Sequence, residues 1–100
     1  MITITALLRA KPGHEATLQA TLLDVAAYAA ANEPGTVGYF VCRSEQDPAL
    51  FTTYERFADR TAMERHNNSA ALARALVAIR PILAEPPAIH TGAELSALQR

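Results

Sequence analysis

The chain has 100 residues, enough for one domain, and half of them are apolar. Its 9 basic and 10 acidic residues nearly balance, and no stretch concentrates positive charge, which argues against a nucleic-acid or anionic-membrane partner. No apolar run approaches the roughly 20 residues that span a bilayer, and the chain opens without a signal-peptide pattern, so a cytoplasmic location is expected.

The N-terminal third predicts a strand followed by a helix. Residues 2–10 alternate between two sets of side chains, the period-two pattern of a β-strand, and Pro12 and Gly13 break it. From about 14 to 32 the apolar residues recur at helical spacing, and the alanine-rich end has high helix propensity. Asn32-Glu33-Pro34-Gly35 ends this helix, because a residue that precedes proline avoids the helical region.

The middle of the chain predicts a hairpin. Residues 36–46 resume the strand alternation, and residues 50–57 are again rich in aromatic and β-branched side chains. A short polar connection separates the two runs, so they are expected to pair antiparallel. The lone cysteine, Cys42, is expected to be a small half-buried strand residue.

The last part predicts two helical segments and a final strand. Asp59 suits the N-cap of a first segment, and Ser69 can cap a second one that ends at Pro81. The inner face of the first segment carries Ala62, Met63 and His66. Residues 88–93 are short enough for a last strand, and a short amphipathic tail follows.

This order, β-α-β-β-α-β with the second helix broken, predicts an α+β domain of the ferredoxin-like type. Right-handed crossovers give a four-stranded antiparallel sheet with the helices on one face. The strands carry apolar or aromatic side chains on both faces, and the helices cover only one of them. A homodimer that packs two such sheets face to face is therefore expected.

Two segments resemble the antibiotic biosynthesis monooxygenase family of dimeric α+β barrels. The first is Ala31-Asn32-Glu33-Pro34-Gly35-Thr36-Val37-Gly38-Tyr39, and the second is Phe51-Thr52-Thr53-Tyr54-Glu55-Arg56-Phe57-Ala58-Asp59, which leads to Met63 and His66. The resemblance implies a domain over 1–94, a tail over 95–100 and a pocket between sheet and helices. It also implies oxidation of a small or polycyclic phenol or quinol by O₂ without metal, flavin or haem.

The sequence departs from the family pattern at three places. Phe57 stands where many members carry tryptophan, and Ser69-Ala70-Ala71 lacks the second histidine that many members carry there. The histidine that the haem-degrading branch carries near Leu76 is missing, so haem degradation is not expected. Fold therefore transfers from the resemblance better than reaction does.

His66 is the main catalytic candidate. It lies on the apolar stripe with Met63, and a neutral imidazole there can remove a proton from a phenol or quinol. The alternative is a histidine satisfied by a backbone carbonyl at a helix end. Asn32 can donate a hydrogen bond to a substrate oxygen, whereas Glu33 is expected to be solvated.

The strand over 50–57 supplies further candidates. Tyr54 and Glu55 point to opposite faces, so only one of them faces the pocket. Tyr54 can hydrogen-bond a substrate carbonyl, and Arg56, on the same face, can hold a developing enolate or lie on the surface. Glu55 can instead pair with an arginine across the dimer. The remaining candidates, which form core or pocket wall, are Phe40, Phe51, Phe57 and Met63.

Other kinds of site find little support. Three scattered histidines without a cysteine or carboxylate at ligand spacing do not predict a metal site, and no phosphate-binding glycine loop or nucleophile elbow is present. Three functions stay open: a cofactor-independent monooxygenase, an isomerase or enolising enzyme on the same scaffold, and a non-catalytic ligand-binding domain.

Overall fold

The computed structural model describes all 100 residues and has the predicted order of elements. Its elements are β1 (Ile2–Arg9), α1 (Glu15–Asn32), β2 (Thr36–Arg43), β3 (Leu50–Phe57), α2 (Arg60–Asn67), α3 (Ala70–Ile79), the 3₁₀ turn η1 (Arg80–Ile82) and β4 (Ala88–Ala93). None of the helices combines the length and apolar character that a bilayer crossing requires.

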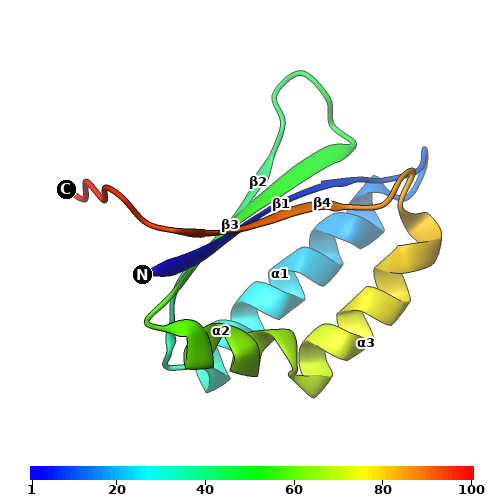
Figure 1. Ribbon diagram of the computed structural model, residues 1–100. Coiled ribbons are helices and arrows are strands. Elements are labelled where there is room, and N and C mark those ends of the chain that lie inside the picture. The colour runs from blue at the N-terminus through cyan, green and yellow to red at the C-terminus, as the bar shows by residue number, and fades with distance from the viewer.

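The four strands form one antiparallel sheet in the order β2-β3-β1-β4, and all three helices lie on one face of it (Figure 1). This confirms the predicted ferredoxin-like α+β fold. The second strand is shorter than predicted and ends at Arg43 rather than at residue 46. The cause is local, because the Ser44 hydroxyl accepts the backbone N–H groups of Gln46 and Asp47 and turns the chain.

Both predicted caps of the broken second helix are present. The Asp59 carboxylate accepts the backbone N–H of Ala62 at 2.8 Å, and the Ser69 hydroxyl accepts that of Leu72 at 3.1 Å. These two caps let α2 and α3 take different directions, so α2 crosses one end of the sheet while α3 runs beside α1 (Figure 1).

The space between sheet and helices holds two clusters of buried side chains. The larger is formed mainly by Leu8, Leu18, Leu22, Phe51 and Ile79. The smaller consists of Ile4, Phe57, Ala62 and Met63, and it fixes α2 against β1 and β3. Burying these side chains is the main source of stability for so small a domain.

The opposite face of the sheet has no helix on it and exposes large apolar side chains. Phe40 is 53% exposed and Tyr54 39% exposed, and their rings stack with centroids 6.2 Å apart. Cys42 belongs to the same face and is exposed, so the half-buried position expected for it is wrong for the single chain. After β4 the chain has no further helix or strand, and Leu95 and Leu98 are exposed.

Candidate functional site

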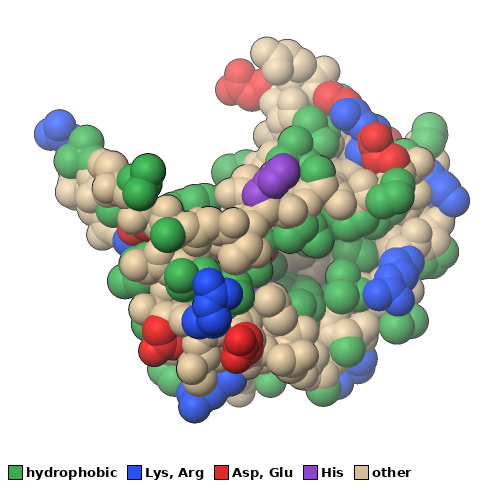
Figure 2. Space-filling view, viewed as in Figure 1, with side chains coloured by type: hydrophobic (Ala, Val, Ile, Leu, Met, Phe, Trp, Pro, Cys, Tyr) green, Lys and Arg blue, Asp and Glu red, His purple; other side chains and the backbone are tan.

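A cavity of about 310 Å³ lies between the sheet and the helices. In Figure 2 it shows as a hollow framed by hydrophobic side chains. The apolar part of its lining consists of Ile4, Ala6, Leu8, Leu22, Val25, Leu72, Ala75, Leu76, Ile79, Pro87 and Ile89. This volume is at the lower end of the range for small-molecule sites.

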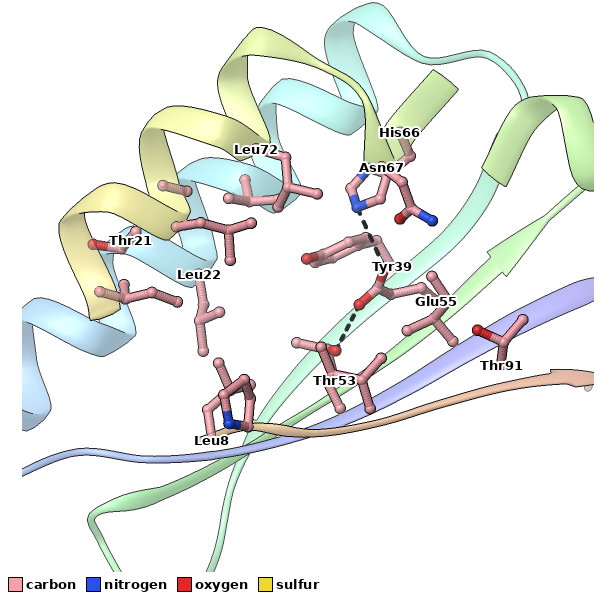
Figure 3. A pocket seen from close by; sticks show the side chains of 18 residues that line it. Leu8, Thr21, Leu22, Tyr39, Thr53, Glu55, His66, Asn67, Leu72 and Thr91 are labelled. Atoms are coloured by element: carbon pink, nitrogen blue, oxygen red, sulfur yellow. Dashed lines mark hydrogen bonds and ion pairs between the residues drawn. The ribbon is translucent and has the colours of Figure 1, made fainter. Parts of the chain in front are cut away.

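Polar side chains gather at one side of this cavity, facing the aliphatic side chains of α1 and α3 (Figure 3). They are Tyr39, Thr53, Glu55, His66, Asn67 and Thr91. The register explains the arrangement, because Tyr39 and Ile4 both pair with Glu55, and Ile4 pairs with Thr91. These residues form one row across all four strands, and every member of the row faces the helices.

His66 is held at this polar side by α2, and its side chain is only 3% exposed. Its Nδ1 lies 2.8 Å from Glu33 Oε1, and its Nε2 lies 3.4 Å from Glu55 Oε1. The imidazole also packs between two aromatic rings, with centroid distances of 5.3 Å to Phe57 and 5.6 Å to Tyr39. A buried carboxylate–imidazole–carboxylate cluster, formed by Glu33, His66 and Glu55, therefore borders the cavity.

Threonine hydroxyls fix both carboxylates of this cluster. Thr36 donates to Glu33 Oε1 at 2.8 Å, and Thr53 donates to Glu55 Oε2 at 2.7 Å. Glu33 Oε2 is buried and has no hydrogen-bond partner. The expectation that Glu33 is solvated is wrong, because the turn after α1 directs its side chain inward to His66. Glu55 pairs with His66 of its own chain.

The cluster changes the acidity of two groups that face the cavity. Burial lowers the pKa of His66, but the hydrogen bonds and charges of Glu55 and Glu33 outweigh it, so this pKa is raised above the usual 6.5. Burial, followed by the charges of Glu55 and Glu33, raises the pKa of Tyr39 well above its usual value of 10. Tyr39 is therefore a neutral phenol, and its hydroxyl points into the cavity (Figure 3).

Three of the predicted site residues lie on the outer face of the sheet and do not line the cavity. Phe40 and Tyr54 stack there, and the Tyr54 hydroxyl donates to Glu94 Oε2 at 2.8 Å. The Arg56 guanidinium donates to both carboxylate oxygens of Glu94, each at 2.8 Å. Because side chains alternate along β3, the position of Glu55 in the cavity puts Tyr54 and Arg56 on the other face.

The other candidates also lie outside the cavity. Asn32 is exposed at the end of α1, where its amide donates to the Tyr28 carbonyl at 3.1 Å, and it borders a separate surface hollow. Phe51, Phe57 and Met63 are buried core residues. Of the eight predicted residues, only His66 lines the cavity itself.

Glu55 is the most important cavity residue that the sequence did not place there. Glu55 is in phase with Phe51 and Phe57, which the helices bury, but the sequence alone does not show which phase is buried. The sequence presents Tyr39 as an ordinary strand residue and gives Thr53 no distinguishing signal. Asn67 and Thr91 have no sequence feature that separates them from surface polar residues.

No group of three or more His, Cys, Asp or Glu side chains is arranged to hold a metal ion. Within the cluster the reason is geometric, since the two ring nitrogens of His66 point in different directions, each to its own carboxylate. One ion cannot occupy both positions.

The fold and this cavity define a small ferredoxin-like domain that encloses an apolar space beside a buried acid–histidine cluster. Residues 1–77 match the antibiotic biosynthesis monooxygenase family, and the chain belongs to that family. No curated protein matches the chain.

Solved structures agree with this assignment. A candidate antibiotic biosynthesis monooxygenase from Caulobacter crescentus is 28% identical with a TM-score of 0.88, covering 95% of this chain and 90% of that one. A Nitrosomonas europaea protein of unknown function is also 28% identical, with a TM-score of 0.85 and coverages of 99% and 93%. A Mycobacterium tuberculosis protein, 20% identical with a TM-score of 0.89 and coverages of 98% and 98%, shares the fold.

Proposed function

We propose that the protein is a monooxygenase that oxidises a small phenol or quinol with O₂, and that the buried cluster around His66 removes the substrate's hydroxyl proton. The observation that carries the proposal is the cluster itself, which borders an apolar cavity in a member of a monooxygenase family. The cavity volume of about 310 Å³ suits one small ring system better than an extended polycycle.

The cavity has an apolar part and a polar side, and this arrangement suits a phenol or quinol. An aromatic ring packs against the aliphatic side chains of α1 and α3, and its hydroxyl lies at the polar side near Glu55 and His66. Loss of the hydroxyl proton leaves an electron-rich anion that can pass an electron directly to O₂. The substrate supplies the electrons and hydrogens that reduce the second oxygen atom to water, so the proposal includes no metal, flavin or haem.

Oxygen uptake tests this function. We expect the protein to consume O₂ with 1,4-dihydroxynaphthalene faster than the autoxidation of the quinol alone, and to do so after treatment with a chelator. Removing both acid–base groups that line the cavity, in the double variant Glu55→Gln/His66→Gln, should lower this rate by about 100-fold. Enolisation of a carbonyl compound needs the same proton removal but consumes no O₂, so an oxygen electrode separates the isomerase alternative. Full activity in this double variant would refute the role of the cluster.

We also propose that the protein acts as a homodimer through the outer face of its sheet. The support is the exposed apolar surface around Phe40 and Tyr54, together with Leu7, which is 39% exposed. Analytical ultracentrifugation should find a dimer that Phe40→Arg converts to a monomer. Val77→Arg is the matched control, because Val77 is 69% exposed on α3, away from this face. A monomeric wild-type protein would exclude the dimer.

A further inference from the structure

The positions of the protons in the buried cluster are constrained by its contacts. Each ring nitrogen of His66 faces one carboxylate oxygen, at 2.8 Å for Glu33 and 3.4 Å for Glu55. A carboxylate oxygen and an unprotonated ring nitrogen are both acceptors, so each contact needs one proton. The three groups therefore share two protons, either as an imidazolium between two carboxylates or as a neutral imidazole beside one carboxylic acid.

In both arrangements the imidazole has no free lone pair for a ligand. Its two nitrogens are occupied by Glu33 and Glu55, and the ring is confined between Phe57 and Tyr39. The side chain is 3% exposed, and although it lines the cavity, both of its nitrogens lie against carboxylates. His66 as the base stays a prediction, and these contacts favour a carboxylate of the cluster as the proton acceptor.

Glu55 does present a free acceptor. It lines the cavity, whereas Glu33 borders only the separate surface hollow. A carboxylate has about four acceptor positions, and Thr53 and His66 occupy two of those on Glu55. With two shared protons the cluster carries one net negative charge, and no lysine or arginine lines the cavity.

We propose that the carboxylate of Glu55 accepts the hydroxyl proton of the substrate, and that His66 and Glu33 are positioning residues that hold it in place. In this step the O–H bond of the substrate breaks, an O–H bond forms on Glu55, and the electron pair stays on the substrate oxygen. The inference rests on the proposed function for its substrate class and adds the atom that receives the proton.

The fluorescence of bound 2-naphthol tests this assignment without turnover. Excited 2-naphthol is a much stronger acid than in its ground state and passes its proton to an acceptor within hydrogen-bond reach, and the resulting anion emits at longer wavelength. Bound to the wild-type protein, the probe should show anion emission. Glu55→Gln keeps the shape and the Thr53 hydrogen bond but takes up no proton, so it should lower the anion-to-neutral emission ratio by about tenfold or more.

Two variants serve as comparisons. His66→Gln should change the emission ratio by less than about twofold, because Glu55 is still present. Glu64→Gln, which alters an exposed carboxylate on the same helix, should behave as the wild type. Anion emission that survives in Glu55→Gln, or that is lost in His66→Gln alone, would overturn the assignment. Anion emission without any O₂ uptake would instead remove the proposed function and leave this inference standing.

Nitrogen NMR of ¹⁵N-histidine protein gives an answer even if Glu55→Gln does not fold or 2-naphthol does not bind. At neutral pH the wild-type spectrum should show that each ring nitrogen of His66 either carries a proton or accepts a hydrogen bond from a carboxylic acid. Glu33→Gln should reduce the protonation of the His66 ring. A substitution at Thr36 that leaves the Glu33 carboxylate in place should leave the protonation of the ring unchanged. A bare Nε2 in the wild-type spectrum would overturn the inference.

Discussion

Gly35 is the point at which the turn after α1 passes closest to α2, and a methyl group added there has no room. A Cβ on Gly35 would lie 2.6 Å from the Cβ of Ala62, where carbon atoms prefer about 3.5–4.0 Å. Ala62 is buried in the first turn of α2, so it cannot turn aside, and the helix or the turn must shift by about 1 Å. Gly35→Ala should therefore lower the free energy of unfolding by about 2 kcal/mol.

Thermal unfolding followed by circular dichroism measures this effect. A loss of about 2 kcal/mol lowers the Tm of a domain of this size by about 8–16 °C. Ala62→Gly alone should cost about 2 kcal/mol, because glycine weakens the helix and a buried methyl group is lost. In the double variant the added methyl occupies the space that the other vacates, so the two changes should offset each other by about 2 kcal/mol.

A double-mutant cycle at one protein concentration decides whether this contact is the cause. If the two costs simply add, within about 0.5 kcal/mol, the close approach of Gly35 and Ala62 is not what limits residue 35. The same cycle bears on the site, since Glu33 precedes this turn and His66 follows Ala62 by one helical turn.

Three further predictions concern pH and the cavity. The pKa of His66 in the folded protein is raised above 6.5, so its contribution to stability is complete below pH 6.5 and is lost as the pH rises through the folded pKa. Urea unfolding at several pH values should show this loss of stability in the wild type but not in His66→Gln. Hydrogen bonds from Arg56 and then Tyr54 lower the pKa of Glu94 to about 2. The contribution of Glu94 to stability is therefore present above pH 4.5 and should disappear near pH 2. Glu94→Gln should lack this acid transition in the same urea experiment. Ala6→Leu fills part of the cavity, so calorimetry should find weaker binding of 2-naphthol. The free energy of unfolding should be unchanged or raised by about 1 kcal/mol. An unchanged affinity would show that 2-naphthol binds elsewhere.

Local signals were sufficient to predict the fold. Strand alternation, the stop at Pro34-Gly35 and the caps at Asp59 and Ser69 each depend on residues within one turn of one another, and each is present in the structure. The limits of β2 were less certain because the Ser44 turn competes with continued pairing.

The site depends on contacts that no local pattern contains. Glu33 and His66 are 33 residues apart in sequence, and the row of Tyr39, Glu55 and Thr91 exists only once the register is set. Alternation placed Tyr54 and Glu55 on opposite faces but did not decide which face the helices cover, because both faces carry aromatic side chains.

Strand β4 joins two parts of the molecule that are otherwise separated by the thickness of the sheet. It pairs only with β1, and all six of its residues are exposed. On one side it supplies Ile89 and Thr91 to the cavity wall, and at its end it delivers Glu94 to Arg56 on the far surface. Detaching this single edge strand would open the cavity and break the ion pair between Arg56 and Glu94 at the same time.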